Sequence, residues 1–207
     1  MRNMLLTMGL GMLVSAAAPA QSASAPAASA PAASSPAPDH PAAWQIAAAV
    51  LPLPDSMRAG AAVLGYREGK LVRLRPGTNE MICLADNPSQ KGFEASCYHK
   101  ALDPFMARGR ALRAAGVKDR HAIDSLRLAD IRAGRFSMPK GPTMLASLFA
   151  ESDSFDPSAG RPEKSSMLHV IYLPYATEAS SGISAAPAKD RPWLMYGGKP
   201  WAHVMLP

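Results

Sequence analysis

Residues 21–43 consist almost entirely of alanine, serine and proline, and this stretch limits where a folded domain can begin. It contains no large apolar side chains whose burial would offset the entropy lost when a chain becomes ordered. Such a composition predicts a disordered spacer with polyproline character. A single globular domain is therefore expected within residues 44–207, a length that is typical of one domain.

The first 20 residues show the three-part pattern of a secretory signal peptide. Arg2 supplies the positive charge, Met4–Val14 is apolar, and the small residues before position 21 end in an Ala-Pro-Ala cleavage pattern. The apolar run is shorter than the ~20 residues that a membrane-spanning helix needs. We predict a cleaved peptide and a soluble, exported protein without a transmembrane anchor, in the periplasm or outside the cell. An uncut anchoring helix is the alternative.

The chain is basic, with a formal net charge of +6 at neutral pH. An exported protein seldom meets nucleic acid, so no nucleic-acid partner is expected. Positive side chains are frequent from Arg108 to Lys140, where Asp119, Asp124 and Asp130 interrupt them. This region is expected either to form a solvated helix surface with ion pairs or to bind an anionic polymer or lipid head group.

Cys83 and Cys97 are the two cysteines of the chain, and an even count in an exported protein favours a disulfide. Residues 80–85 and 93–98 have the pattern of strands, with a run of turn-forming residues between them. A hairpin centred on Gln90 would place residue 83 opposite residue 97, where the side chains are close enough to be bridged. We therefore predict the Cys83–Cys97 disulfide.

The competing interpretation makes Cys97 a reactive thiol. Residues 97 and 99 lie on the same face of a strand, because the side-chain period of a strand is two. His99 would then be the base and Asp86 or Glu94 its orienting group, in a thiol-dependent mechanism. A disulfide at Cys97 would leave no thiol for this chemistry.

The order of the predicted elements indicates the fold class. Four short strands are expected from residue 61 to residue 98, with turn residues between them. Helices are expected at 103–116 and 121–133, while 143–150 fits a helix or a strand. Later strands are expected at 167–173, 193–195 and 202–206. This order predicts an α+β domain with a mainly antiparallel sheet, formed by an N-terminal meander and C-terminal strands, and two or so helices in the middle.

Three histidines on predicted strands are the candidate metal ligands: His99, His169 and His203. If these strands are adjacent, three neutral imidazoles with an open fourth position would form a catalytic zinc or copper site. A histidine on a buried strand is otherwise a hydrogen-bonded core residue, and in that case no cofactor is expected.

Aromatic residues near the C-terminus are candidates for lining a ligand groove: Tyr175, Trp193, Tyr196 and Trp201. The alternative is that these rings cover the core beneath a long loop.

The motifs of the common hydrolases, nucleotide-binding proteins and thiol oxidoreductases are absent from the sequence. We therefore expect an exported, soluble, single-domain protein with a non-enzymatic binding or structural role. The alternative is an exported metal- or thiol-dependent hydrolase.

Overall fold

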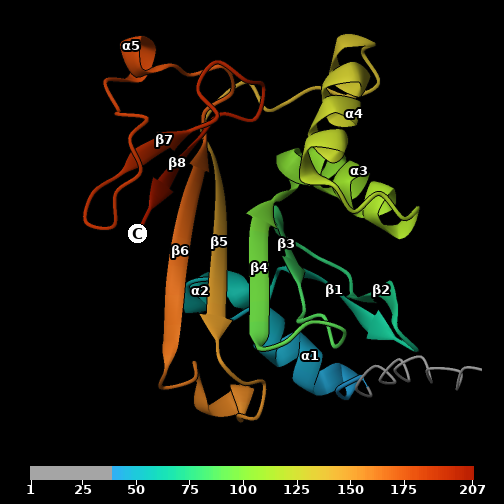
Figure 1. The fold of residues 1–207 in the computed structure, drawn as a ribbon. Helices are drawn as coiled ribbons and strands as arrows, with labels where there is room; N and C mark the ends of the chain where they lie inside the picture. The colour runs from blue at the N-terminus through green and yellow to red at the C-terminus, as the bar shows by residue number, and fades with distance from the viewer. Residues whose placement is uncertain (1–38) are drawn as a thin grey trace, which may run out of the picture. The chain divides into compact units, whose positions relative to one another are not determined.

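The computed structural model describes residues 39–207. The predicted signal peptide (1–20) and residues 21–38 of the predicted spacer lie outside the described residues. In the described part, eight strands form one sheet in the order β2-β1-β3-β4-β5-β6-β8-β7, accompanied by five α-helices (Figure 1). All neighbouring strands but one pair are antiparallel, so the predicted α+β class with a mainly antiparallel sheet is confirmed.

The N-terminal half of the sheet contains β1 (Ala62–Arg67), β2 (Lys70–Arg75), β3 (Met81–Leu84) and β4 (Phe93–His99). A tight turn joins β1 to β2, and its residues Glu68 and Gly69 both have positive φ, as such turns require. β3 pairs with β1 in parallel, which a simple meander does not predict. The chain reaches the other edge of β1 because the N–H groups of Thr78 and Asn79 donate to the Gly60 carbonyl.

The remaining strands are β5 (Thr143–Ala150), β6 (Ser165–Tyr172), β7 (Trp193–Met195) and β8 (His203–Leu206). Residues 143–150, which fitted a helix or a strand, form a strand because they pair along their length with both β4 and β6. β6 lies between β5 and β8, in agreement with the apolar character of both of its faces.

Five helices connect or follow these strands: α1 (Ala42–Ala49), α2 (Asp55–Arg58), α3 (Asp103–Ala114), α4 (Arg120–Arg132) and α5 (Glu178–Ser181). α1 begins two residues before Trp44 and is held to β1 by the buried side chain of Gln45. The Gln45 amide accepts from the Tyr66 N–H at 2.7 Å and donates to the Tyr66 carbonyl at 2.9 Å. None of the helices among residues 39–207 is long and apolar enough to cross a membrane.

Successive residues of β4 face opposite sides of the sheet and therefore contribute to two different cores. Cys97 belongs to the core that α1 covers, together with Ala49 and Val63. Tyr98 belongs to the opposite core, together with residues of α3 and with residues near the starts and ends of the C-terminal strands: Leu102, Phe105, Met138, Val170, Tyr172 and Trp201. The second core is the one that bears on function.

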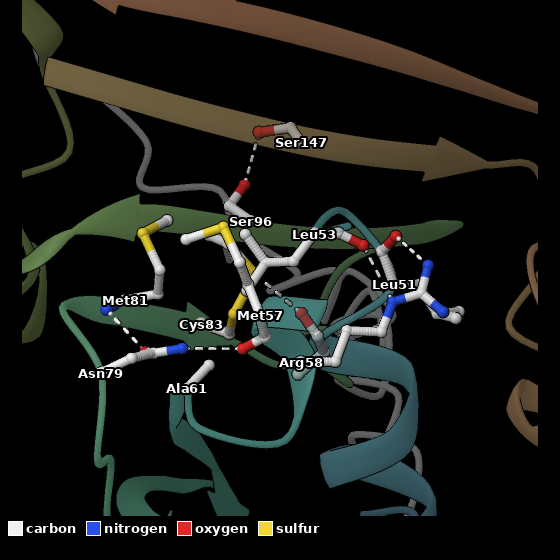
Figure 2. The surroundings of a disulfide bond; sticks show 12 residues. Leu51, Leu53, Met57, Arg58, Ala61, Asn79, Met81, Cys83, Ser96 and Ser147 are labelled. Carbon is white, nitrogen blue, oxygen red and sulfur yellow. Dashed lines mark hydrogen bonds between the residues drawn. A yellow bond between two sulfur atoms is a disulfide. The ribbon is translucent and has the colours of Figure 1, made fainter. Parts of the chain in front are cut away.

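The predicted Cys83–Cys97 disulfide is present, with an S–S distance of 2.07 Å. The register of β3 and β4 places the two cysteines directly opposite each other. Both side chains are fully buried in a core that includes Leu53 and Met81, and Figure 2 shows Cys83 among these residues. The bond therefore ties together two neighbouring strands inside the α1-side core.

Candidate anion-binding site

A cavity of about 250 Å³ lies at the end of the sheet where β6 stops and β8 starts. α3 and α4 lie beyond this end of the sheet, and residues of both helices line the cavity (Figure 1). The lining consists of aromatic rings, basic side chains, one histidine and one carboxylate: Phe105, Arg113, Lys118, Arg120, Ile123, Asp124, Arg127, Tyr172, Tyr196, Trp201 and His203. Four cations and a single carboxylate make this lining strongly positive.

Arg127 is the buried cation of the cavity, with 8% of its surface exposed. Its guanidinium carbon lies 4.0 Å from the centre of the Phe105 ring, a cation–π contact. Its Nη1 forms an ion pair with the Asp124 carboxylate at 3.6 Å, a distance longer than a hydrogen bond. The buried Nε of Arg127 has no hydrogen-bond partner within residues 39–207. Burial lowers the pKa of Arg127, although an arginine stays protonated in proteins.

Trp201 supplies a second buried donor without a partner. This residue is 6% exposed, and its indole N–H has no hydrogen-bond acceptor among the described residues. A buried donor that lacks an acceptor costs about 1–3 kcal/mol, so native proteins contain few of them. Arg127 and Trp201 thus both line the cavity, and each carries a buried donor nitrogen without an acceptor among the described residues.

The rim of the cavity carries three exposed cations, Arg113, Lys118 and Arg120. No carboxylate in the described part of the chain lies within salt-bridge distance of any of them. The Arg120 guanidinium carbon lies 5.6 Å from the centre of the Tyr196 ring. The rim cations are therefore available to a ligand.

Other basic residues of the Arg108–Lys140 region are neutralised by protein carboxylates. Asp130 accepts hydrogen bonds from Arg108 and Arg135, and the Arg108 bond is the main reason that its pKa lies below the usual range. Arg110 donates to Asp103 at 2.9 Å. The region thus contains ion-paired side chains on the helix surface. It also contains the rim cations, which line the cavity and form no salt bridge among the described residues.

His203 and Tyr172 pair directly across β8 and β6 and form the strand side of the cavity. The His203 Nδ1 lies 2.8 Å from the Trp201 carbonyl oxygen, so Nδ1 carries the proton that is donated. Burial lowers the pKa of His203 and raises the pKa of Tyr172 to about 12. At neutral pH the cavity therefore presents an uncharged imidazole and an un-ionised phenol.

The three candidate metal ligands do not converge. His203 faces the side of the sheet that carries Tyr172, whereas His169 is three residues before Tyr172 on β6 and faces the opposite side. His99 lies at the end of β4, with β5 between it and β6, and its Nε2 is 4.0 Å from Glu80. No group of three or more potential ligands capable of holding a metal occurs within residues 39–207. The hypothesis of a three-histidine zinc or copper site is thus wrong in its geometry, because strand positions alone did not reveal the facing.

Cys97 and His99 do not form a nucleophile–base pair. The sulfur of Cys97 is bonded to that of Cys83 and is fully buried, so it provides no thiolate. The interpretation of Cys97 as a catalytic thiol is therefore incorrect.

The four candidate aromatic residues do not all lie at the same site. Tyr196 and Trp201 line the cavity together, whereas Trp193 lies on β7 and does not line it. Tyr175 is 57% exposed and belongs to a different surface. Trp201 lines the cavity and also packs into the second core.

The sequence pattern did not assign the Phe105 ring to a ligand site, and it gave Arg127 no separate role. The available signal was the apolar stripe of residues 103–116, in which Gly109 takes a position that would otherwise carry a side chain. No family model matches this chain, and neither a curated protein nor a solved structure matches it. The function of the site must therefore be inferred from its geometry.

Proposed function

We propose that this is an exported, non-enzymatic binding protein that holds the anionic group of a compact organic molecule in the cavity between α3, α4 and the C-terminal strands. Export is supported by the sequence of residues 1–20 and by the disulfide, which is typical of oxidising compartments. The anionic partner expected for the Arg108–Lys140 region is narrowed to a ligand that enters this cavity.

One observation carries the proposal: Arg127 and Trp201, whose buried donor nitrogens lack acceptors among the described residues, both line the same cationic cavity. Hydrogen bonds to charged groups contribute about 1.5–3 kcal/mol, more than bonds between neutral groups. An anion that reached these donors would satisfy both and would be attracted by the rim cations.

The walls indicate what the anion is attached to. Phe105, Tyr172, Tyr196 and Trp201 offer ring faces and edges, which pack well against a planar or ring-shaped body. A volume of about 250 Å³ suits a single ring with its anionic substituent. The ligand class is thus a ring-bearing carboxylate, sulfonate or phosphate.

Benzenesulfonate is a suitable probe, because it combines a ring with a permanently charged anion, and benzenesulfonamide is its uncharged counterpart. Nuclear magnetic resonance of the ¹⁵N-labelled full chain separates the indole N–H signals of the three tryptophans, and Trp201→Phe assigns one of them. We expect benzenesulfonate to shift the Trp201 indole signal along a saturable curve, with a Kd on the order of 1 mM or tighter.

The matched variants are Arg127→Met and Arg132→Met, on the same helix. Arg127 lines the cavity, whereas Arg132 is exposed and does not. Arg127→Met should weaken binding by about tenfold or more, since it removes a charged donor, and Arg132→Met should leave binding unchanged. Equal shifts with benzenesulfonamide, or equal movement of all three indole signals, would show that the proposal is wrong.

A further inference from the structure

One ring nitrogen of His203 forms a hydrogen bond, and the other has no hydrogen-bond partner among residues 39–207. Nδ1 donates to the Trp201 carbonyl at 2.8 Å, which fixes the tautomer of the neutral ring. Nε2 then carries a lone pair, and no residue within 39–207 forms a hydrogen bond with it. The ring lines the cavity and lies 4.9 Å from Tyr172 and 5.6 Å from Tyr196, measured between ring centres.

The charged and titratable groups around His203 come from every element that lines the cavity. β6 contributes Tyr172, and the segment after β7 contributes Tyr196. The helices and their connection contribute four cations and one carboxylate: Arg113, Lys118, Arg120, Arg127 and Asp124. In this setting burial is the main cause of the lowered pKa of His203, and Arg120 acts in the same direction. The imidazole is therefore uncharged while no anion is bound.

An anion in the cavity would change this balance. Its negative charge would oppose the effect of the surrounding cations and would favour the charged imidazolium. Nε2 would then become an N–H donor that faces an acceptor, while the Nδ1–H bond to Trp201 remains in place. A neutral Nε2 offers an anion only a lone pair, which is an unfavourable contact.

We propose that the cavity binds its anion together with one proton, which is taken from solvent and carried on Nε2 of His203. This inference rests on the proposed anion-binding function and specifies its regulation. No covalent bond changes, and the proton returns to solvent when the ligand leaves. Binding of a ligand with constant charge should therefore tighten as the pH falls, by at most about tenfold per pH unit.

Benzenesulfonate suits this test because its own charge does not change between about pH 5 and pH 8, the range in which histidine titrates. Calorimetry of the full chain in two cationic buffers of different ionisation enthalpy measures the protons taken up per ligand bound. Cationic buffers are needed because buffer anions would compete for the cavity. We expect uptake that rises toward one proton in the pH range above the pKa of free His203.

The matched variants are His203→Asn, which retains a donor for the Trp201 carbonyl, and His169→Asn, at an exposed histidine of β6. His203→Asn should remove both the proton uptake and the pH dependence, and His169→Asn should retain both. Independently of any variant, the imidazole of His203 should titrate at higher pH when benzenesulfonate is present.

The outcomes separate the two proposals. Binding that is independent of pH, with no proton uptake in either buffer, would overturn the role of His203 and leave anion binding intact. Absence of benzenesulfonate binding at every pH would overturn the proposed function itself.

Discussion

The guanidinium of Arg127 on α4 occupies the space beside α3 that a side chain at Gly109 would fill. A Cβ at position 109 would overlap the nitrogen Nη2 of Arg127. The glycine thus lets α4 bring a buried cation against the Phe105 ring, and the shape of α3 sets the depth of the anion site.

Gly109→Ala should therefore weaken anion binding, although it leaves the identity of every cavity-lining residue unchanged. The added methyl group displaces the guanidinium, and we expect the affinity for benzenesulfonate to fall by about tenfold or more. Gly141→Ala is the matched control, because its Cβ would meet no atom within 4 Å. Titration of the Trp201 indole signal measures both variants, and equal affinities would contradict the packing argument.

The stability of the protein without ligand should decrease in mild acid through His203. Burial lowers the pKa of His203 in the folded state, so the unfolded state binds more protons below about pH 6.5. The free energy of unfolding should then fall as the pH falls below that value. Urea denaturation at a series of pH values measures the slope. His203→Asn should flatten this slope and His169→Asn should not, so the same slope in both variants would argue against the assignment.

Loss of the disulfide should destabilise the fold by about 3 kcal/mol, the usual effect for a loop of this length. Cys83 and Cys97 are 14 residues apart and join neighbouring strands. Urea denaturation of the Cys83→Ala/Cys97→Ala double variant, beside the oxidised protein, gives the difference. Because both sulfurs are fully buried, a reductant should act on the native protein only as fast as it opens. Rapid reduction under native conditions would contradict this burial.

Gln45→Met should destabilise the fold by about 1–3 kcal/mol, because it removes the acceptor of a part-buried backbone N–H. The substitution removes the bond from the Tyr66 N–H, which ties β1 to α1, and also the bonds that the Gln45 amide donates to the carbonyls of Tyr66 and His40. Gln90→Met, in the exposed turn between β3 and β4, is the matched control and should change stability little. Thermal denaturation of the two variants compares them, and similar midpoints would show that Gln45 has no anchoring role.

Local sequence patterns predicted the pairing of strands that a short turn connects. The opposition of Cys83 and Cys97 followed from a hairpin centred on Gln90, since pairing in a hairpin is set by its turn. The parallel pairing of β1 with β3 did not follow from the sequence, because the connection after β2 could pass to either edge of β1. The sequence also did not predict that His169 and His203 lie on opposite faces of the sheet. Their relative orientation depends on the register of β6 against β8, which no local pattern encodes.

The cavity was beyond a sequence pattern because its walls come from segments far apart in the chain. In the sequence, Arg127 is one of many basic residues. Its buried position depends on the space that Gly109 leaves for the guanidinium, which only the folded structure shows. Trp201 was a candidate on chemical grounds, but the missing acceptor of its indole N–H is a property of the folded structure alone.

The residues that line the cavity are far apart in the sequence, and this bears on when the cavity forms during folding. The cations of the cavity precede residue 128, whereas Trp201 and His203 belong to the last seven residues of the chain. Before β8 pairs with β6, the cations of the cavity are not yet joined by the part of the wall that Trp201 and His203 form. Under the proposed function, anion binding would therefore require β8 to have paired with β6, because that pairing brings Trp201 and His203 to the cavity.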